Sequence, residues 1–575
     1  MGRFSSLSPA ILLLSLQILT RVFTFGLNQL LIRFSSPALY GAAHIRCELV
    51  LGIVLFLSRE GIRAATLRQD DRSEIQAEGK DRKSKHGVDQ EAGSEGGNLS
   101  LLPIPLGILF ALLALPLFTS SSTESQETRP YQDTVIHLYL LSALLELLSE
   151  PLYLHALSAR GGRNLALRVR AEGSAAIAKG VVTLAGVFSL GEEAGLLAFG
   201  LGQAAYGAAI LLTFTGSYSL RFGLGRTLHL YMPNWSSPAK PKDESRTSTD
   251  RLAVLLFLQS ILKHLLTEAD KIAVSRLASL EDQGGYALGT NYASLPLRLV
   301  FQPLEESSRF QFCQTLGSLS DDRADGANTT ASTKETQVGK VTSEPATQSR
   351  AKAKHLLTSL LHLHLFLGLF LLSYLPPLSR PFIQALSGSQ WASTSAPRTL
   401  SAFALFLPVA GWSGILEGFL QSTASPTELK RYNRVILSSS ATFGVVLWTL
   451  TRERVAREVG VSTEEALLYA STASMAVRAL FGWRYAVGFF KRSQELALTD
   501  LLPSRATVLT TAASAGLLRA VASRLPFSED PMAVLPLKAY GPVVLAALST
   551  GVGALGIMWS QDRQSIMHAL SALHG

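Results

Sequence analysis

Residues 12–41 read LLLSLQILTRVFTFGLNQLLIRFSSPALYG, an almost unbroken apolar run with few polar interruptions. A helix that crosses a bilayer needs about 20 mostly apolar residues, and this run is longer. It is too long for a signal peptide, carries Arg21 in its middle and lacks a small-residue cleavage site. We therefore expect it to contain the first membrane-spanning helix, over residues 8–34.

Apolar stretches of this kind recur along the whole chain of 575 residues, which is 47% hydrophobic and 17% charged. The mean hydropathy of +0.25 is high for a soluble protein and low for a bundle that meets only lipid. The pattern predicts an all-α polytopic membrane protein with about 14 transmembrane helices. The expected helices cover residues 8–34, 37–62, 101–119, 133–157, 165–190, 193–219, 252–277, 284–314, 355–376, 399–422, 432–450, 464–489, 505–524 and 538–559.

Three long polar connections and an internal repeat suggest how these helices are grouped. The connections bury too little apolar surface to fold alone, so we expect them to be disordered or loosely held at the membrane surface. LQILTR at residues 16–21 resembles LQSILK at residues 258–263, and the helix that follows each begins near a Gly/Tyr pair. The predicted organisation is a six-helix lobe over 1–220 with a polar insertion at 67–97, a cytosolic linker over 221–250, a six-helix lobe over 251–490 with a polar insertion at 318–349, and two further helices with a short tail over 491–575.

The distribution of Lys and Arg among the loops predicts the orientation in the membrane. An even number of helices puts both termini on one side. Loops on that side carry roughly three times the Lys and Arg of the other, although Arg452, Arg454 and Arg457 dissent. The positive-inside rule therefore predicts cytosolic termini. The three N-x-[ST] sequons, which begin at Asn98, Asn234 and Asn328, fall in loops predicted to be cytosolic and should carry no glycan.

Polar residues inside the apolar helices fall on common faces. A charge within a membrane helix costs about 2.5–3.5 kcal/mol on insertion scales, so it is retained where it meets water or a partner. The aligned sets are Gln17, Arg21, Thr24 and Asn28 in the first helix, Glu48, Arg59 and Arg63 in the second, Gln259, Lys263 and Asp270 on one face and His264, Glu268 and Lys271 on another face of the seventh, and Asn291, Arg298, Gln302, Glu305 and Arg309 in the eighth.

Two interpretations of these stripes compete. In the first, they line a central hydrophilic cavity whose arginines receive an anionic group, because the guanidinium fork donates two hydrogen bonds to phosphate at once. In the second, they form interhelical ion pairs that only fix the fold, such as Arg59 or Arg63 with a glutamate, or Lys271 with Glu268. Arg33 and Arg276 lie near helix ends, where an arginine can also extend to lipid phosphates.

Several other classes of function find no support in the sequence. The net charge of +9 is scattered over loops without the basic, aromatic-laced stripe of a nucleic-acid site. The chain has no P-loop motif, no H-E-x-x-H and no C-x-x-C, and its two cysteines cannot form a disulfide framework. His355, His362 and His364 lack nearby carboxylates, which favours helix packing over a metal site. We therefore expect no metal site, no cofactor and no nucleic-acid partner.

Several short runs, taken in order along the chain, resemble the eukaryotic Rft family, the endoplasmic-reticulum oligosaccharide-lipid translocation proteins. The similarity starts with the run at residues 12–41 and covers nearly the whole chain. FLSREGIR (56–63) and RLVFQPLEES (298–307) are its most specific parts. The further runs are FLSREGIRAA (56–65), LLSEPLYLHAL (147–157), LLTEADK (265–271), DQGGY (282–286), LPLRLVFQPLEES (295–307), GILEGFL (414–420) and SMAVRALF (474–481).

The resemblance implies a fold similar to the multidrug, oligosaccharidyl-lipid and polysaccharide exporter superfamily, with two six-helix lobes in a V and two extra helices. It implies a dolichol-diphosphate-linked oligosaccharide, Man5GlcNAc2, as the ligand. In the LLTEADK run, Ala269 stands where the family pattern has Gly and Lys271 where it has Arg. The residues that match the family's motifs are Arg21, Arg33, Arg59, Arg63, Glu268, Arg298, Glu305 and Arg478.

The combined hypothesis is a multi-pass protein of the endoplasmic-reticulum membrane that flips this lipid-linked oligosaccharide to the lumenal leaflet for N-glycosylation, or assists the flip, without being an enzyme. The arginines at 21, 33, 59, 63, 298 and 478 would bind the diphosphate, and Glu268 and Glu305 would position them. Gln17, Asn28, Asn291 and Gln302 would give polar support. Expected partners are the dolichol-linked oligosaccharide, membrane lipids and glycan-assembly machinery. The alternatives are a non-transporting lipid-linked-oligosaccharide chaperone or scaffold, an ion-coupled exporter of the same superfamily, and a membrane glycosyltransferase, for which the sequence lacks a sizeable acidic lumenal loop.

Overall fold

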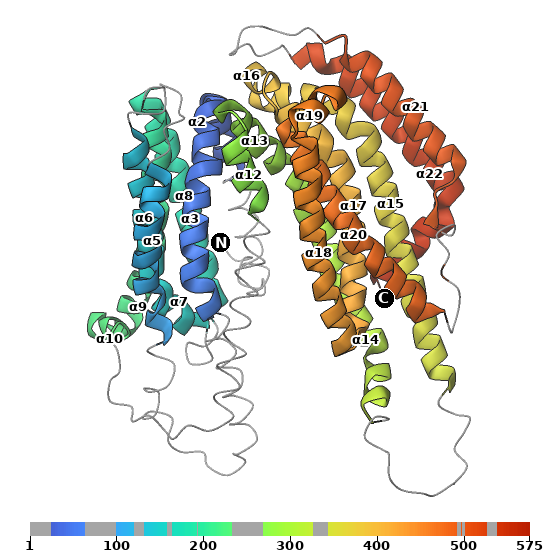
Figure 1. Cartoon of the computed structure of the whole chain (residues 1–575), viewed down its shortest axis with the longest axis horizontal. Helices are drawn as coiled ribbons and strands as arrows, with labels where there is room; N and C mark the ends of the chain where they lie inside the picture. The colour runs from blue at the N-terminus through green and yellow to red at the C-terminus, as the bar shows by residue number, and fades with distance from the viewer. Residues whose placement is uncertain are drawn as a thin grey trace, which may run out of the picture. The chain divides into compact units, whose positions relative to one another are not determined.

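Helices account for almost all of the structure, a computed structural model (Figure 1). The chain divides into two compact units, Met1–Gly284 and Gly285–Gly575. The six-helix lobes expected from the sequence, over 1–220 and 251–490, have other boundaries and remain a prediction. The structure describes residues 23, 25–63, 99–119, 131–157, 164–191, 194–232, 268–325, 343–491, 496, 501–525 and 537–574.

Seven helices among these residues are long and apolar enough to cross a bilayer, and an eighth is added if the bent pair Thr427–Leu450 and Glu453–Val459 is one span. The prediction of an all-α polytopic membrane protein is confirmed, and the total of about 14 spans stays a prediction. The seven are Pro37–Arg63, Gln132–Leu157, Ala166–Leu190, Gly195–Phe222, Gln348–Ser387, Ala396–Thr423 and Lys538–Arg563.

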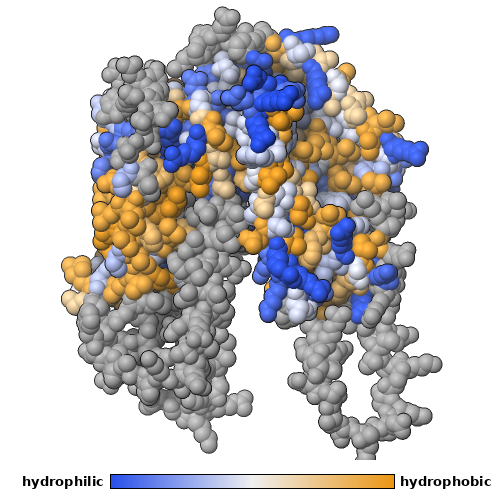
Figure 2. Space-filling model, in the orientation of Figure 1, coloured by the Kyte–Doolittle hydropathy of each residue, from blue (hydrophilic) through white to orange (hydrophobic). Residues whose placement is uncertain are grey.

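The first unit consists of helices packed side by side, several of which cover its outside with apolar side chains. Figure 2 shows a hydrophobic band across this surface, to which α5 contributes Ile108, Leu109, Leu112 and Leu113, all about half exposed or more. Such a surface suits contact with lipid chains. The elements are α2 (Pro37–Gly41), η1 (Ala42–Cys47), α3 (Glu48–Leu55), η2 (Phe56–Glu60), η3 (Leu99–Leu101), α5 (Pro103–Thr119), α6 (Gln132–Leu148), α7 (Glu150–Leu157), α8 (Leu165–Leu190), α9 (Gly195–Phe222), α10 (Leu224–His229) and α12 (Ala269–Leu277).

A buried polar clamp joins α6 to α9. The Ser142 hydroxyl donates to the Gln203 carbonyl oxygen at 2.7 Å, and the Gln203 amide donates back to Ser142 Oγ at 3.2 Å. Gly207 lies one turn further along α9, where an added Cβ would lie 2.7 Å from the Ser142 carbonyl oxygen. Small residues that let two backbones approach, together with interhelical hydrogen bonds, are the usual means of association between membrane helices.

The second unit is built around the long helix α15. It contains four buried leucines between Leu356 and Leu361, which pack with Ile415, Leu416 and Phe419 of α17 and with Phe490 of α20. The elements are α13 (Leu280–Pro296, which begins before the boundary), η6 (Leu297–Phe301), α14 (Gln302–Asp325), α15 (Ser343–Ser387), α16 (Ser389–Ala392), α17 (Ala396–Thr423), α18 (Pro426–Leu450), α19 (Glu453–Val459), α20 (Thr463–Phe490), α21 (Arg505–Ala522), η8 (Leu537–Tyr540) and α22 (Gly541–His574).

The prediction that the insertion at 318–349 is disordered is wrong at both of its ends, which are helical. Helix α14 continues to Asp325, and α15 already begins at Ser343. Charged residues such as Asp321 and Arg323 do not end a helix that has left the membrane, because backbone hydrogen bonds propagate once the helix is nucleated. Helix α15 also runs past its expected end at residue 376 because neighbouring membrane helices can accommodate prolines inside a span.

Candidate functional site

Two arginines of the span Pro37–Arg63 face two glutamates of the span Gln132–Leu157, and the members of each set are four residues apart. We call these two ion pairs the arginine-glutamate ladder. Arg59 Nη1 lies 3.1 Å from Glu146 Oε2. Arg63 binds Glu150 through both of its acceptor oxygens, with Nη2 donating to Oε2 at 2.8 Å and Nε donating to Oε1. The carboxylates are buried, with 6% and 1% of their side chains exposed, while the guanidiniums keep 24% and 21%. The positive groups are therefore the ones that a ligand can reach.

The backbone on both sides of this ladder departs from regular α-helix. Arg59 lies in the π-helical turn η2, and Pro151 has no backbone N–H with which to continue α6 into α7. The helix breaks at Ser149, between the two glutamates, and the Ser149 hydroxyl donates to the Glu146 carbonyl oxygen at 2.7 Å. The two carboxylates thus belong to different helical segments, α6 and α7.

Tyr231, which lies beyond α10, binds the end of α6 next to the break at Ser149. Its hydroxyl donates to the Leu148 carbonyl oxygen at 2.8 Å. Burial raises the pKa of Tyr231 to about 12, so the phenol stays protonated and remains a donor at neutral pH. The Leu148 carbonyl oxygen, the last of α6, therefore has a side-chain donor.

π-Helical turns recur where the charged residues are. Three such turns lie in the described residues: η1 carries His44 and Arg46, η2 carries Arg59, and η6 carries Arg298. Single π-turns inside α-helices often mark functional sites. Two of the three lie in the second expected helix and one in the eighth, which occupy matching places in the two predicted lobes.

A small cavity of about 70 Å³ adjoins the ladder, with room for a few ordered waters. The Arg63 guanidinium lies 4.1 Å from the centre of the Tyr153 ring, and that of Arg168 lies 5.8 Å from the same centre. Arg168 in turn donates to Glu172 at 2.8 Å. The cavity is lined by Arg59, Arg63, Glu146, Ser149, Tyr153, Arg168, Glu172, Tyr206, Ile210 and Phe214.

Three arginines and two glutamates line this cavity, and Glu150, the partner of Arg63, adds the third carboxylate that balances the charge. A guanidinium has five N–H donors, and Arg63 uses two of them on Glu150. The remaining N–H groups can donate to a doubly anionic group if the carboxylates release some of their hydrogen bonds to the arginines. The arrangement can therefore bind phosphate by exchange of partners, but it does not present bare positive charge.

A second polar group lies nearer the N-terminal end of the span Pro37–Arg63. Glu48 accepts from Lys179 of α8 at 3.2 Å and lies 3.0 Å from His44 Nδ1. Arg46 Nε donates to the Gln283 side-chain oxygen at 3.3 Å. Glu48 thus pairs with α8, whereas Arg59 and Arg63 pair with α6 and α7, and the common face expected for the three residues stays a prediction.

Other predicted residues of the first unit lie outside the ladder. Gln17 and Arg21 fall outside the described residues, while Asn28 and Arg33 are half-buried at the end of the first helix. Glu268 precedes α12 and pairs with Lys271 at 2.8 Å, the structural alternative expected from the sequence.

In the second unit the predicted residues do not converge on one cluster within the part of the chain that the structure describes. Arg298 and Gln302 are exposed, Asn291 is half-buried, and Gln302 donates to Glu306 at 3.1 Å. Glu305 pairs with Arg309 of its own helix at 3.0 Å. Arg478 donates to Ser439 Oγ at 3.2 Å, which ties α20 to α18.

Sequence reasoning missed Glu146, Glu150, Tyr153 and Arg168, as well as Lys179. One signal was available, because two glutamates four residues apart within the apolar stretch 133–157 match the four-residue spacing of Arg59 and Arg63. His362 and His364, considered for a metal, instead pack in α15 against Phe366 and Phe301. The described residues hold no group of three or more potential metal ligands.

Comparisons with known proteins agree with this picture over most of the chain. The chain is 28% identical over 549 residues to the Man(5)GlcNAc(2)-PP-dolichol translocation protein RFT1 of Yarrowia lipolytica, covering 88% of this chain and 74% of that protein. It is 31% identical over 429 residues to the protein of that name from Schizosaccharomyces pombe, covering 73% and 72%.

A solved inward-facing structure of a multidrug resistance MATE family transporter of the MOP superfamily shares the fold, with a TM-score of 0.50 at 12% identity, over 84% of this chain and 98% of that one. The family model described as Rft protein matches residues 5–569, almost the whole length. The chain therefore belongs to the Rft protein family.

Proposed function

We propose that this chain moves the dolichol-diphosphate-linked oligosaccharide Man5GlcNAc2 from the cytosolic to the lumenal leaflet of the endoplasmic-reticulum membrane, or assists that movement, for protein N-glycosylation. Support comes from the relatives that carry this activity in their names and span most of the chain. It also comes from the arginine-glutamate ladder, because a diphosphate is a group that several guanidiniums can bind together.

The orientation of the chain belongs to the same proposal. Both termini are cytosolic, and about 14 spans form two six-helix lobes in a V, over 1–220 and 251–490, with two more helices over 491–575. In this orientation Arg59, Arg63 and Arg168 lie toward the cytosolic ends of their helices. That is the leaflet from which the lipid-linked sugar has to be taken up.

The observation that carries the proposal is the cavity of about 70 Å³ beside Arg59 and Arg63. Its volume is far below that of a sugar chain, so it takes at most part of the diphosphate while Glu146 and Glu150 turn aside. Salt bridges that change partners are one means by which proteins switch between two arrangements. The other residues assigned to the ligand are Arg21, Arg33, Arg298 and Arg478, with Glu268 and Glu305 as positioning carboxylates and Gln17, Asn28, Asn291 and Gln302 as polar support.

Complementation of a strain that lacks its own family member tests the arginine assignment. Arg59→Glu should abolish growth while the protein is still made and inserted, because two buried carboxylates would then face each other and repel phosphate. Arg170→Glu is the matched control, since Arg170 is exposed on α8 and is absent from the cavity lining. Full complementation by Arg59→Glu would show that the arginine assignment is wrong.

A second function, a lipid-linked-oligosaccharide chaperone or scaffold that transports nothing, is favoured by one observation. Arg59 and Arg63 already have carboxylate partners, which is the arrangement that fixes a fold without any ligand. Reconstitution separates the two functions. Purified protein in vesicles should transfer a lipid-linked oligosaccharide between leaflets if it is a translocator, and should bind it without transfer if it is a chaperone.

A further inference from the structure

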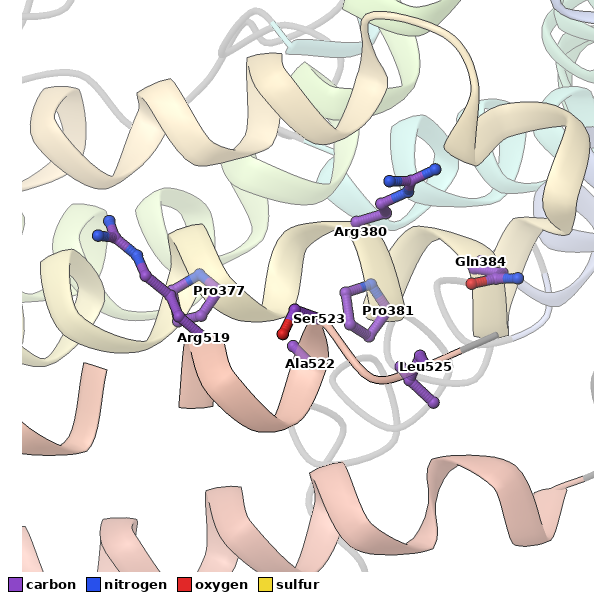
Figure 3. A pocket seen from close by; sticks show the side chains of 8 residues that line it. All are labelled: Pro377, Arg380, Pro381, Gln384, Arg519, Ala522, Ser523 and Leu525. Atoms are coloured by element: carbon purple, nitrogen blue, oxygen red, sulfur yellow. The ribbon is translucent and has the colours of Figure 1, made fainter. Parts of the chain in front are cut away.

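A second cavity lies in the second unit between α15 and α21 and belongs to neither the ladder nor the charged groups described above. Its volume is about 230 Å³. Figure 3 shows Arg519 of α21 extending beside Pro377, with Arg380 and Gln384 further along α15. The lining residues are Pro377, Arg380, Pro381, Gln384, Arg519, Ala522, Ser523 and Leu525.

The two helices shape this cavity through residues that leave space and offer few backbone donors. Pro377 and Pro381 form part of the α15 wall, and neither has a backbone N–H. Ala522 ends α21 with a small side chain opposite them. The Ser523 hydroxyl donates to the Ala520 carbonyl oxygen at 3.1 Å. The donors left for a ligand are therefore side chains and not the backbone.

Those side chains favour an anion that only accepts hydrogen bonds. Arg380 and Arg519 are exposed and come from different helices. The Gln384 side chain is 93% buried, and its amide nitrogen has no hydrogen-bond partner in the described structure. An unpaired buried amide donor costs about 1–3 kcal/mol, so an acceptor placed beside it is stabilised. None of the eight lining residues is acidic.

The position of the cavity along its helices indicates which anion it meets. Arg380 and Gln384 lie in the last two turns of the span that ends at Ser387, and Arg519 lies in the last turn of α21. The ends of spanning helices meet the head-group layer, where an arginine side chain reaches lipid phosphates, here those of the lumenal leaflet in the proposed orientation. A volume of about 230 Å³ is below the usual 300–1,000 Å³ of pockets for drug-sized ligands and suits a phosphate with its glycerol carbons.

We propose that this cavity binds the phosphate of a membrane phospholipid as a resident lipid site, separate from the oligosaccharide path. Arg519 pairs with the phosphate oxygens, and the Gln384 amide donates to a head-group oxygen at the other end of the cavity (Figure 3). Pro377, Pro381 and Leu525 contact the glycerol and the start of the acyl chains. The lipid thereby bridges α15 and α21 at the membrane rim.

Binding of dioctanoyl phosphatidylinositol to the purified full chain in neutral detergent tests this. Native mass spectrometry should find one lipid retained per chain. Arg519→Gln and Gln384→Leu should each weaken retention by roughly tenfold, the usual effect of losing a hydrogen bond to a charged group. Arg398→Gln removes an exposed arginine near the start of α17 in the same unit, outside the lining, and should leave retention unchanged.

A filling variant separates lost binding from lost folding. Ala522→Leu keeps both arginines and narrows the cavity, so it should lower retention without changing the charge. Elution as a single species by size-exclusion chromatography shows that each variant is folded. An equal loss from Arg398→Gln, or retention unaffected by Ala522→Leu and Gln384→Leu together, would overturn the proposal. Displacement of the lipid by inorganic phosphate at low concentration would assign the cavity to a free anion instead.

Discussion

Arg63 donates to both carboxylate oxygens of Glu150 through two guanidinium nitrogens, and only 1% of that glutamate side chain is exposed. One turn away, Arg59 makes a single contact with Glu146 at 3.1 Å. The two rungs therefore differ in strength although their spacing is the same. Bidentate geometry fixes both partners, whereas a single contact leaves donors available. Arg63 is the better candidate for holding the fold, and Arg59 for meeting a ligand.

The Arg63 rung should be costly to break. Removing one partner of a buried ion pair costs about 3–5 kcal/mol because the other charge is left uncompensated. Arg63→Gln should therefore lower the melting temperature in detergent strongly. The double swap Arg63→Glu with Glu150→Arg should recover part of the loss. Arg168→Gln is the control: its pair with Glu172 is about half exposed, so the loss should stay below about 1 kcal/mol. Equal losses from Arg63→Gln and Arg168→Gln would contradict this ranking.

The Tyr153 ring should contribute through its face and not through its hydroxyl. The Arg63 guanidinium carbon lies 4.1 Å from the ring centre, and the ring also packs edge-on against Phe214. Tyr153→Leu should destabilise the protein by about 0.5–2 kcal/mol beyond the loss of packing, the range for a partly desolvated cation–π contact. Tyr153→Phe should be near wild type in thermal unfolding. A loss from Tyr153→Phe as large as that from Tyr153→Leu would point to the hydroxyl instead.

Gly41 should tolerate no side chain, whereas Gly52 in the same span should. A Cβ at Gly41 would lie against the Leu280 carbonyl oxygen and 2.5 Å from the Gly284 backbone nitrogen, so two backbones would have to move apart. We expect Gly41→Ala to cost about 1–3 kcal/mol, as for other overpacked positions. Gly52 has nothing within 4 Å of such a Cβ, and Gly52→Ala should be neutral or stabilising by up to about 1 kcal/mol. The melting temperatures of the two variants, measured side by side, decide this.

Among the described residues, several expected helices are confirmed because the length of an apolar stretch reports the length of its own helix. The stretch 133–157 is described as a span over Gln132–Leu157, and 399–422 as one over Ala396–Thr423. Hydropathy fails where polar helix leaves the membrane, as at Asp325, because water supports an existing helix as readily as a loop. Long helices therefore begin earlier and end later than their apolar portions.

The sequence predicted the arginines of the candidate site but not their glutamate partners. Arg59 and Arg63 are visible as charges on an apolar face, but which partner they choose depends on which helices touch, and periodicity within one helix does not contain that information. No proline precedes the π-helical turn at Phe56–Glu60, so the sequence carries no signal for it, whereas η6 directly follows Pro296. Tertiary contact decided the pairs.

Glycosylation of an introduced sequon tests the predicted orientation. If both termini are cytosolic, the segment between the third and fourth expected helices faces the lumen, and Ser121→Asn creates the sequon Asn-Ser-Thr there. This variant should gain a glycan that endoglycosidase H removes, while the sequons at Asn98, Asn234 and Asn328 should remain unmodified. The shift is read on a gel before and after digestion, with the wild-type chain as the matched control. A glycan on any of the three natural sequons would invert the orientation and would move the Arg59 and Arg63 ladder to the lumenal leaflet, where it could release the diphosphate but not capture it.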